Sequence, residues 1–205
     1  MIGYLLQGLG YGGVAAAQPG PFQAYLLSQT LKNGLRSTLV AALAPLISDG
    51  PIIALVLLVL TQVPIWFVAI LRFGGSLFLI YLARKAYQSA KMMDNELPQP
   101  TIEKRQSIRE AALMNMLSPN AYIYWSTVTG PVFLDGWHLS PAIGIGFMVA
   151  FYVALIGGFM GFVVLFGIMG RAEPRLNKTL GYVSAIALVG FAIYQVWDGV
   201  QDLIA

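Results

Sequence analysis

Long apolar stretches alternate with short polar segments along this chain. Each stretch reaches the roughly 20 residues that a helix needs to cross the hydrocarbon core of a bilayer. The stretches lack the strict apolar–polar alternation of membrane β-strands, which favours helices. The predicted spans are 2–31, 38–60, 65–88, 109–134, 141–169 and 179–201. The pattern therefore predicts an all-α integral membrane protein with six transmembrane helices.

Prolines interrupt two of these stretches. Pro19-Gly20-Pro21 divides the first stretch, and Ser118-Pro119-Asn120 divides the fourth. Proline removes a backbone donor and clashes with the preceding turn, and glycine adds backbone freedom. Unpaired backbone at membrane depth is tolerated only where protein buries it or where it lines a wet cavity. We therefore expect helices one and four to be broken at a binding site. The alternative is that the prolines only kink them.

Polar side chains accompany both interruptions. Amide groups both donate and accept hydrogen bonds, and a broken helix exposes an N-terminus that favours an anionic group. The candidate substrate-binding residues are Gln18, Pro19, Gly20, Pro21, Gln23, Asn115, Ser118, Pro119 and Asn120.

Asp49 lies near the middle of the second predicted span, and Arg72 lies a little inside the third. An acid at that depth costs about 2.5–3.5 kcal/mol on insertion scales, so it needs a partner or a wet cavity. We expect Asp49 to exchange a proton during transport, with a purely structural, paired role as the alternative. Arg72 is the natural partner of Asp49 and a second candidate for proton coupling. The rival interpretation is that Arg72 extends to the outer headgroups.

Composition and charge exclude a soluble fold and set the topology. Only 10% of the residues are charged, whereas soluble domains carry about 25%, so this chain cannot cover a water-facing surface. The Lys and Arg residues gather in the first, third and fifth connections between spans. Because basic loops stay cytoplasmic, we predict a multi-pass protein of the inner membrane with both termini outside, on the periplasmic side.

The third connection, 91–108, is the main polar segment and is predicted as a cytoplasmic linker between 1–90 and 109–205. Each part holds three spans, and because three is odd, the two parts enter the membrane from opposite sides. Gly74 and Tyr87-Gln88 recur as Gly181 and Tyr194-Gln195 at the same spacing. We therefore predict two inverted-topology three-helix repeats within a single membrane domain.

Other chemistry finds little support in the sequence. There is one histidine, no cysteine, no phosphate-binding glycine loop and no nucleophile elbow. We expect no catalytic residue, no metal and no cofactor, and no nucleic-acid partner because the cations sit in loops between apolar runs. Small residues recur on one face of the fifth span, where we expect ordinary packing rather than a sliding or dimerising surface. They are Gly146, Ala150, Ala154, Gly157 and Gly161.

Four elements occur together: 18–21 in span one, Asp49 in span two, 70–82 in span three and 115–120 in span four. In this combination the chain resembles the lysine-exporter (LysE) family of amino-acid translocators, over most of its length. The resemblance implies six helices in two inverted repeats and export of amino acids or similar small solutes, usually driven by the proton gradient. The resemblance is also compatible with a homodimer. The Asn-Pro-Lys that the family often has at the second break is Ser118-Pro119-Asn120 here.

These features predict a secondary transporter, not an enzyme, that exports amino acids or related small metabolites by proton-coupled alternating access. Its partners would be a small-molecule substrate and the lipid bilayer. Because Asp49 is the one firm acid in the membrane, we expect a neutral or weakly polar amino acid rather than lysine. Two alternatives stay open. One is a cation or metal exporter that uses Asp49 and backbone carbonyls as ligands, and the other is a non-transporting membrane assembly subunit.

Overall fold

The computed structural model describes residues 1–58, 64–92, 104–172 and 174–204, and within these ranges the chain is helical, with no strand. The helices are α1 (Ile2–Ala17), α2 (Pro21–Asn33), α3 (Leu35–Ala41), α4 (Ala44–Leu58), α5 (Ile65–Met92), α6 (Lys104–Met116), α7 (Pro119–Tyr124), the π-helical turn η1 (Trp125–Thr129), α8 (Gly130–Leu139), α9 (Pro141–Ala172) and α10 (Pro174–Ile204). Most of the predicted linker 91–108 falls outside the described residues. Its described ends belong to α5 and α6.

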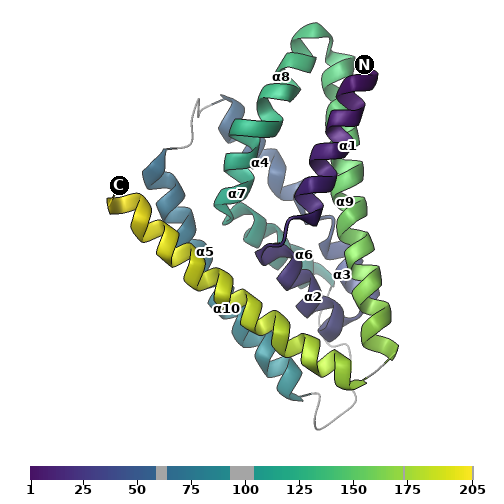
Figure 1. Cartoon of the computed structure of the whole chain (residues 1–205), viewed down its shortest axis with the longest axis vertical. Helices are drawn as coiled ribbons and strands as arrows, with labels where there is room; N and C mark the ends of the chain where they lie inside the picture. The colour runs from purple at the N-terminus through teal and green to yellow at the C-terminus, as the bar shows by residue number, and fades with distance from the viewer. Residues whose placement is uncertain (59–63, 93–103, 173, 205) are drawn as a thin grey trace.

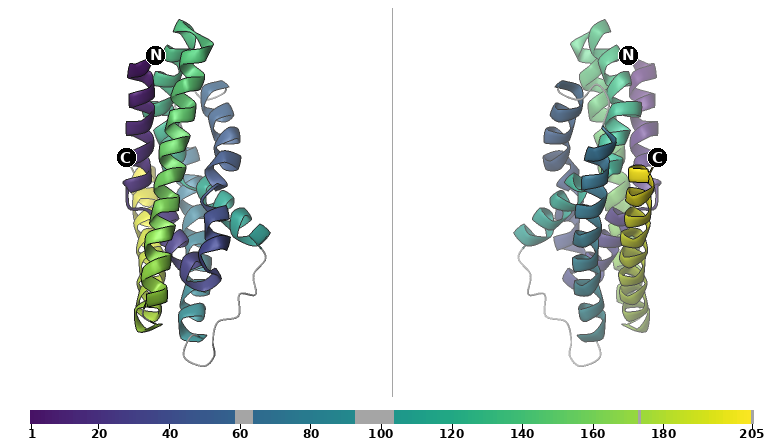
Figure 2. Two further views of the ribbon diagram at one scale, coloured as in Figure 1. Left: turned by 90° about the vertical axis from the view of Figure 1, so that its right-hand side faces the viewer. Right: turned by 90° about the vertical axis from the view of Figure 1, so that its left-hand side faces the viewer.

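Two long helix pairs frame the molecule. α10 packs along α5, and α1 packs along the upper part of α9 (Figure 1). α2, α3 and α6 lie between the pairs in the lower part of that view, and α4 and α7 lie higher up. The side views show the same two pairs edge on (Figure 2). In these side views α4 and α6 lie to one side of the two pairs (Figure 2).

The α1–α9 pair depends on small residues. A Cβ atom added to Gly12 would lie 2.2 Å from the Phe151 carbonyl oxygen, and one added to Gly8 would lie 2.5 Å from the Phe147 carbonyl oxygen. Glycines four residues apart on one face let two membrane helices approach backbone to backbone. Of the small residues predicted on the fifth span, Ala150 and Ala154 contact this face of α1. A Cβ at Gly157 or Gly161 would meet nothing within 4 Å, so these two glycines are outside the contact.

Both predicted interruptions divide helices. α1 ends at Ala17 and α2 begins at Pro21, with Gln18 and Gly20 in extended conformation between them. α6 ends at Met116, and α7 begins at Pro119 after an extended Ser118. In each case proline occupies the first position of the new helix, where its missing N–H costs nothing and its fixed φ suits the helix.

A third break separates α3 from α4 and was not predicted. Ala42 and Leu43 form a turn, in which the Leu43 N–H donates to the Val40 carbonyl. Pro45 explains the break, because it supplies no N–H to continue the hydrogen bonds of α3. The second predicted span is thus two helices joined by a turn at Ala42 and Leu43, and it begins at Leu35 instead of residue 38.

The outer surface is apolar. Ile186 and Leu77 are 71% exposed, and Val153 is 62% exposed, on α10, α5 and α9 respectively. Serine, threonine and asparagine side chains of α2 and α3 are buried instead. This distribution is the reverse of that in soluble proteins and fits a lipid environment. Among the described residues, four helical segments are long and apolar enough to cross a membrane: Leu35–Leu57, Ile65–Lys91, Pro141–Met169 and Lys178–Gln201. The first and fourth predicted spans do not qualify, because their breaks leave shorter helices. The chain is a multi-pass membrane protein.

Candidate functional site

A cavity of about 300 Å³ lies between the two broken helices. Its wall is formed by the α1–α2 junction, α4, α5, the α6–α7 junction, η1, α9 and one residue of α10. The predicted residues on this wall are Gln18, Pro19, Gly20, Pro21, Gln23, Asp49, Asn115, Ser118 and Asn120. Pro119 is buried beside the cavity without lining it, and Arg72 does not line it. The two breaks are far apart in the sequence but line the same cavity.

The first break is closed by its own glutamine. The Gln23 side-chain amide donates to the Ala16 carbonyl at 3.0 Å and to the Gln18 carbonyl at 2.6 Å. These are carbonyls at the end of α1 that lack partners in the helix, and such groups need a donor when water is excluded. The amide nitrogen of Gln23 is thus occupied by the backbone, which gives this predicted substrate ligand a structural role.

The second break is closed from two sides. The Tyr122 hydroxyl donates to the Met116 carbonyl at 2.9 Å, where α6 ends. On α5, a Cβ added to Gly75 would lie 2.8 Å from the Leu117 carbonyl oxygen. Any larger residue at position 75 would push the break away from α5. The glycine is required here for close approach of two backbones.

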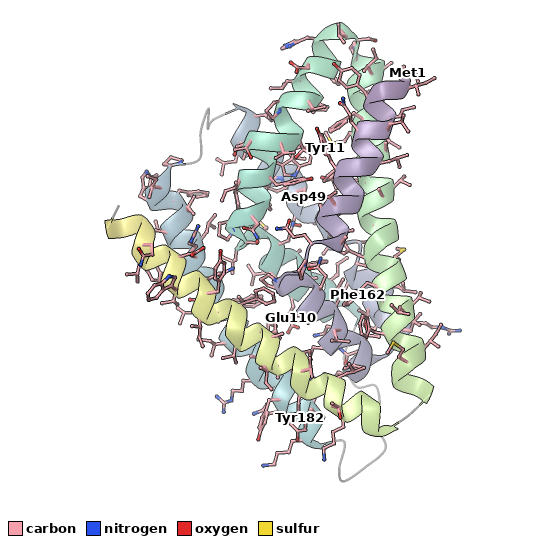
Figure 3. All side chains as sticks on the ribbon, in the orientation of Figure 1. Met1, Tyr11, Asp49, Glu110, Phe162 and Tyr182 are labelled. Carbon is pink, nitrogen blue, oxygen red and sulfur yellow. The ribbon has the colours of Figure 1, made fainter. Side chains whose placement is uncertain are left out.

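Asp49 is the centre of a hydrogen-bonded cluster beside the cavity. Its side chain is 4% exposed. The Asn115 amide donates to Asp49 Oδ1 at 2.6 Å, and the Tyr152 hydroxyl donates to Oδ2 at 3.0 Å. The same Asn115 nitrogen lies 2.8 Å from Ser48 Oγ, and the fully buried Trp125 also lines the cavity. Figure 3 shows Asp49 inside the bundle, between α1 and the α7–η1 segment.

The donors to Asp49 all come from the other half of the chain. Asp49 belongs to α4, whereas Asn115 and Tyr152 belong to α6 and α9. Sequence reasoning missed Tyr152, because an aromatic residue in an apolar span carries no signal that separates a hydrogen-bond donor from a lipid anchor. The π-helical turn that begins at Trp125 is a local departure that often accompanies functional sites.

Arg72 does not pair with Asp49. Its guanidinium Nη1 lies 2.7 Å from Asp198 Oδ2, which joins α5 to α10. In the structure the ion-pair partner of Arg72 is therefore Asp198 instead of Asp49. The rival interpretation, in which Arg72 extends to the outer headgroups, stays a prediction. Gly199 explains the geometry, because a Cβ there would already lie 3.4 Å from the Arg72 Cβ. The signal for this pair was Asp198 itself, an acid in the sixth predicted span.

A second ion pair joins three helices on the other side of the cavity. Lys85 Nζ of α5 lies 2.5 Å from Glu110 Oε1 of α6. The Tyr25 hydroxyl of α2 donates to Glu110 Oε2 at 3.3 Å. In Figure 3, Glu110 lies below Asp49, at the level of α2. We call Tyr25, Lys85 and Glu110 the lower cluster.

Charge is scarce on the cavity wall. Among the described residues that line it, Asp49 carries the only formal charge, and the rest are amides, hydroxyls and apolar groups. Gln195 Oε1 of α10 is buried and finds no hydrogen-bond partner within the described ranges. No group of three or more acidic, histidine or cysteine side chains that could hold a metal ion occurs in the part of the chain that the structure describes.

Comparison with known proteins identifies the family. The family model for LysE type translocators matches residues 14–199, which is most of the chain. This match includes both breaks, Asp49 and the helices that carry its hydrogen-bond donors. Comparison with curated proteins and with solved structures gave no match. The chain is a member of the LysE type translocator family.

Proposed function

We propose that this protein is a secondary transporter that exports amino acids or related small metabolites across the cytoplasmic membrane. Family membership supports small-molecule export, and the observation that carries the mechanism is the position of Asp49. A buried carboxylate of the first half accepts its hydrogen bonds from side chains of the second half, at the edge of a cavity. Intramembrane acids of this kind are expensive and typically serve ion or substrate pathways.

Six crossings in two inverted repeats are the arrangement that we propose for the fold. The helix pairing supports it: α5 and α10, the last helices of each half, pack on one another. α1 packs on α9, and α6 packs on α3 and α4, so the broken helix of each half contacts the second span of the other. An inverted pair of three-helix units related by a two-fold axis in the membrane plane would produce this pattern. With basic loops inside, both termini are periplasmic.

Proton binding to Asp49 is the proposed coupling step. An ionised carboxylate accepts hydrogen bonds only, so it suits the Asn115 amide and the Tyr152 hydroxyl at the same time. Protonation converts one carboxyl oxygen into a donor, which then faces the Asn115 nitrogen or the Tyr152 hydroxyl. The link between the two halves weakens, and the halves become free to separate around the cavity.

Alternating access requires contacts that close the cavity on each side in turn, and two ion pairs have the right positions. Arg72 and Lys85 lie 13 residues apart on α5, about 20 Å along the helix. The cavity-lining residues of α5, namely Gly75, Phe78 and Leu79, lie between them. We propose that the Arg72–Asp198 pair closes the outer side and that the lower cluster closes the cytoplasmic side.

Uptake into inside-out membrane vesicles tests the proposal. We expect a panel of labelled amino acids to include at least one that enters in a manner abolished by an uncoupler. Asp49→Asn should abolish this uptake, because an amide cannot exchange a proton. Asp135→Asn is the matched control, since Asp135 is exposed on α8. Absence of uptake for every solute, or full uptake by Asp49→Asn, would contradict the proposal.

A further inference from the structure

The cavity has a polar end and an apolar end along α9. Tyr152 marks the polar end, where its hydroxyl reaches Asp49. Phe151, Leu155 and Phe159 are buried, line the cavity and share one face of α9, because they are four residues apart. Phe159 lies seven residues beyond Tyr152, which is about 10 Å along the helix axis. Along α9, the side chains at the cavity therefore change from a hydrogen-bonding group to hydrocarbon over the length of one small molecule.

Aromatic rings from two helices meet at the apolar end. The rings of Phe159 and Phe22 are 4.8 Å apart between centroids, and Phe22 is the second residue of α2, directly after the first break. Both rings line the cavity, together with Phe78 and Leu79 of α5. The nearby Gln23 amide is occupied by two backbone carbonyls. A solute group at this end would meet aromatic and aliphatic carbon.

We infer that the Phe22–Phe159 pair is the side-chain subsite of the cavity and that it selects solutes with one polar head and one bulky apolar group. The inference rests on the proposed function and names its substrate class: amino acids with large aliphatic or aromatic side chains. The polar head lies toward Asp49 and Asn115, and the apolar side chain lies against Phe159 and Phe22. A volume of about 300 Å³ suits one such molecule.

The same geometry excludes other amino acids. A lysine or glutamate side chain would place a second charge at the phenylalanine pair. No described side chain on the wall there carries an opposite charge. Burying an unpaired charge is strongly unfavourable, and burying a small polar side chain without a partner is moderately so. Serine would in addition leave the apolar end empty, so it would lose the contacts that hold a larger side chain.

Binding to the purified protein and transport in proteoliposomes together test this inference. The probes are leucine, phenylalanine, lysine, glutamate and serine, with binding followed by thermal stabilisation of the full chain in detergent. We expect leucine and phenylalanine to bind about tenfold or more tightly than the other three, since a few methylene groups in an apolar pocket are worth factors of ten to a few hundred. Phe159→Ala should weaken phenylalanine binding by about tenfold and leave serine binding unchanged.

Phe166→Ala is the matched control. Phe166 also belongs to α9 and also pairs with a ring, Phe162 at 4.6 Å between centroids, but it does not line the cavity. Phe159→Leu keeps most of the side-chain volume and is the conservative variant to use if Phe159→Ala does not fold. It should bind leucine almost as well as the unaltered protein. Equal effects of Phe159→Ala and Phe166→Ala on every solute would overturn the inference.

The outcomes separate the inference from the proposed function. Transport that favours lysine, glutamate or serine would overturn the subsite while supporting export. Tight leucine binding without transport of any probe would overturn export while supporting the subsite. Neither binding nor transport of any probe would overturn both.

Discussion

The Tyr152 hydroxyl donates to Asp49 Oδ2 at 3.0 Å, across 103 residues of sequence. This contact joins α9 to α4 beside the cavity, and the Asn115 amide is the other donor to the carboxylate. Removal of the hydroxyl is therefore a sensitive probe of what Asp49 does.

Tyr152→Phe should reduce proton-coupled uptake by about tenfold or more, because a hydrogen bond to a charged group is worth about 1.5–3 kcal/mol. The ring and its packing are retained, so the protein should stay folded. Tyr194→Phe is the control, since Tyr194 is 60% exposed. If Tyr152 acts through Asp49, the double variant Asp49→Asn with Tyr152→Phe will be no worse than Asp49→Asn alone. An additive loss would contradict a shared role.

The Arg72–Asp198 pair should stabilise the contact between α5 and α10. Asp198→Asn leaves a cation in the membrane with its carboxylate partner removed, and we expect the free energy of unfolding in detergent to fall by about 1–3 kcal/mol. The exchanged pair Arg72→Asp with Asp198→Arg should recover part of the loss. Chemical unfolding followed by tryptophan fluorescence measures both. A double variant that is less stable than either single variant would argue against the pairing.

Gly12 and Gly10 offer a matched comparison within α1. Gly12→Ala places a methyl group 2.2 Å from the Phe151 carbonyl oxygen, whereas a Cβ at Gly10 meets nothing within 4 Å. Alanine in a helix is favoured over glycine by roughly 0.5–1 kcal/mol, so Gly10→Ala should be neutral or slightly stabilising. Gly12→Ala should destabilise by about 1–3 kcal/mol, since a fixed backbone atom must move. Thermal unfolding of the two variants side by side checks this.

The lower cluster should control access to the cavity from the cytoplasmic side. Glu110→Gln removes the charge opposite Lys85 and should favour opening on that side. The chain has no cysteine, so a single Ser118→Cys provides a clean label inside the cavity. We expect a membrane-impermeant thiol reagent applied to inside-out vesicles to react several-fold faster when Glu110→Gln is added. An unchanged rate would show that the cluster does not limit access.

The sequence predicted the broken helices because their cause is local. Pro19, Pro21 and Pro119 act on the backbone next to them, and their effect needs no knowledge of the rest of the fold. Local reasoning also predicted that Asp49 needs a partner or a wet cavity, since an acid in an apolar span is costly when it faces lipid. Pro45 acts by the same mechanism, but the uninterrupted apolar run around it hid the break between α3 and α4.

The contact partners of individual side chains could not be predicted from the sequence, because they depend on which helices pack together. Arg72 had two acids within plausible depth, Asp49 and Asp198, and only the crossing of α5 and α10 at Gly199 decides between them. Gln23 looks like a substrate ligand by composition, yet its amide caps the carbonyls of the break that it follows. Phe22 and Phe159 are ordinary apolar residues until α2 and α9 bring their rings together.

The glycine face of α1 also affects the order in which the protein can assemble. Gly8 and Gly12 fit against Phe147 and Phe151, which are made more than a hundred residues later. At the usual rate of translation this is a delay on the order of ten seconds. During that time α1 has no protein neighbour for its glycine face, and only the arrival of α9 fixes it. α1 is made before the other described helices and is thus among the last to be fixed in place, and a chain stalled before residue 141 would lack the α9 face that α1 packs against.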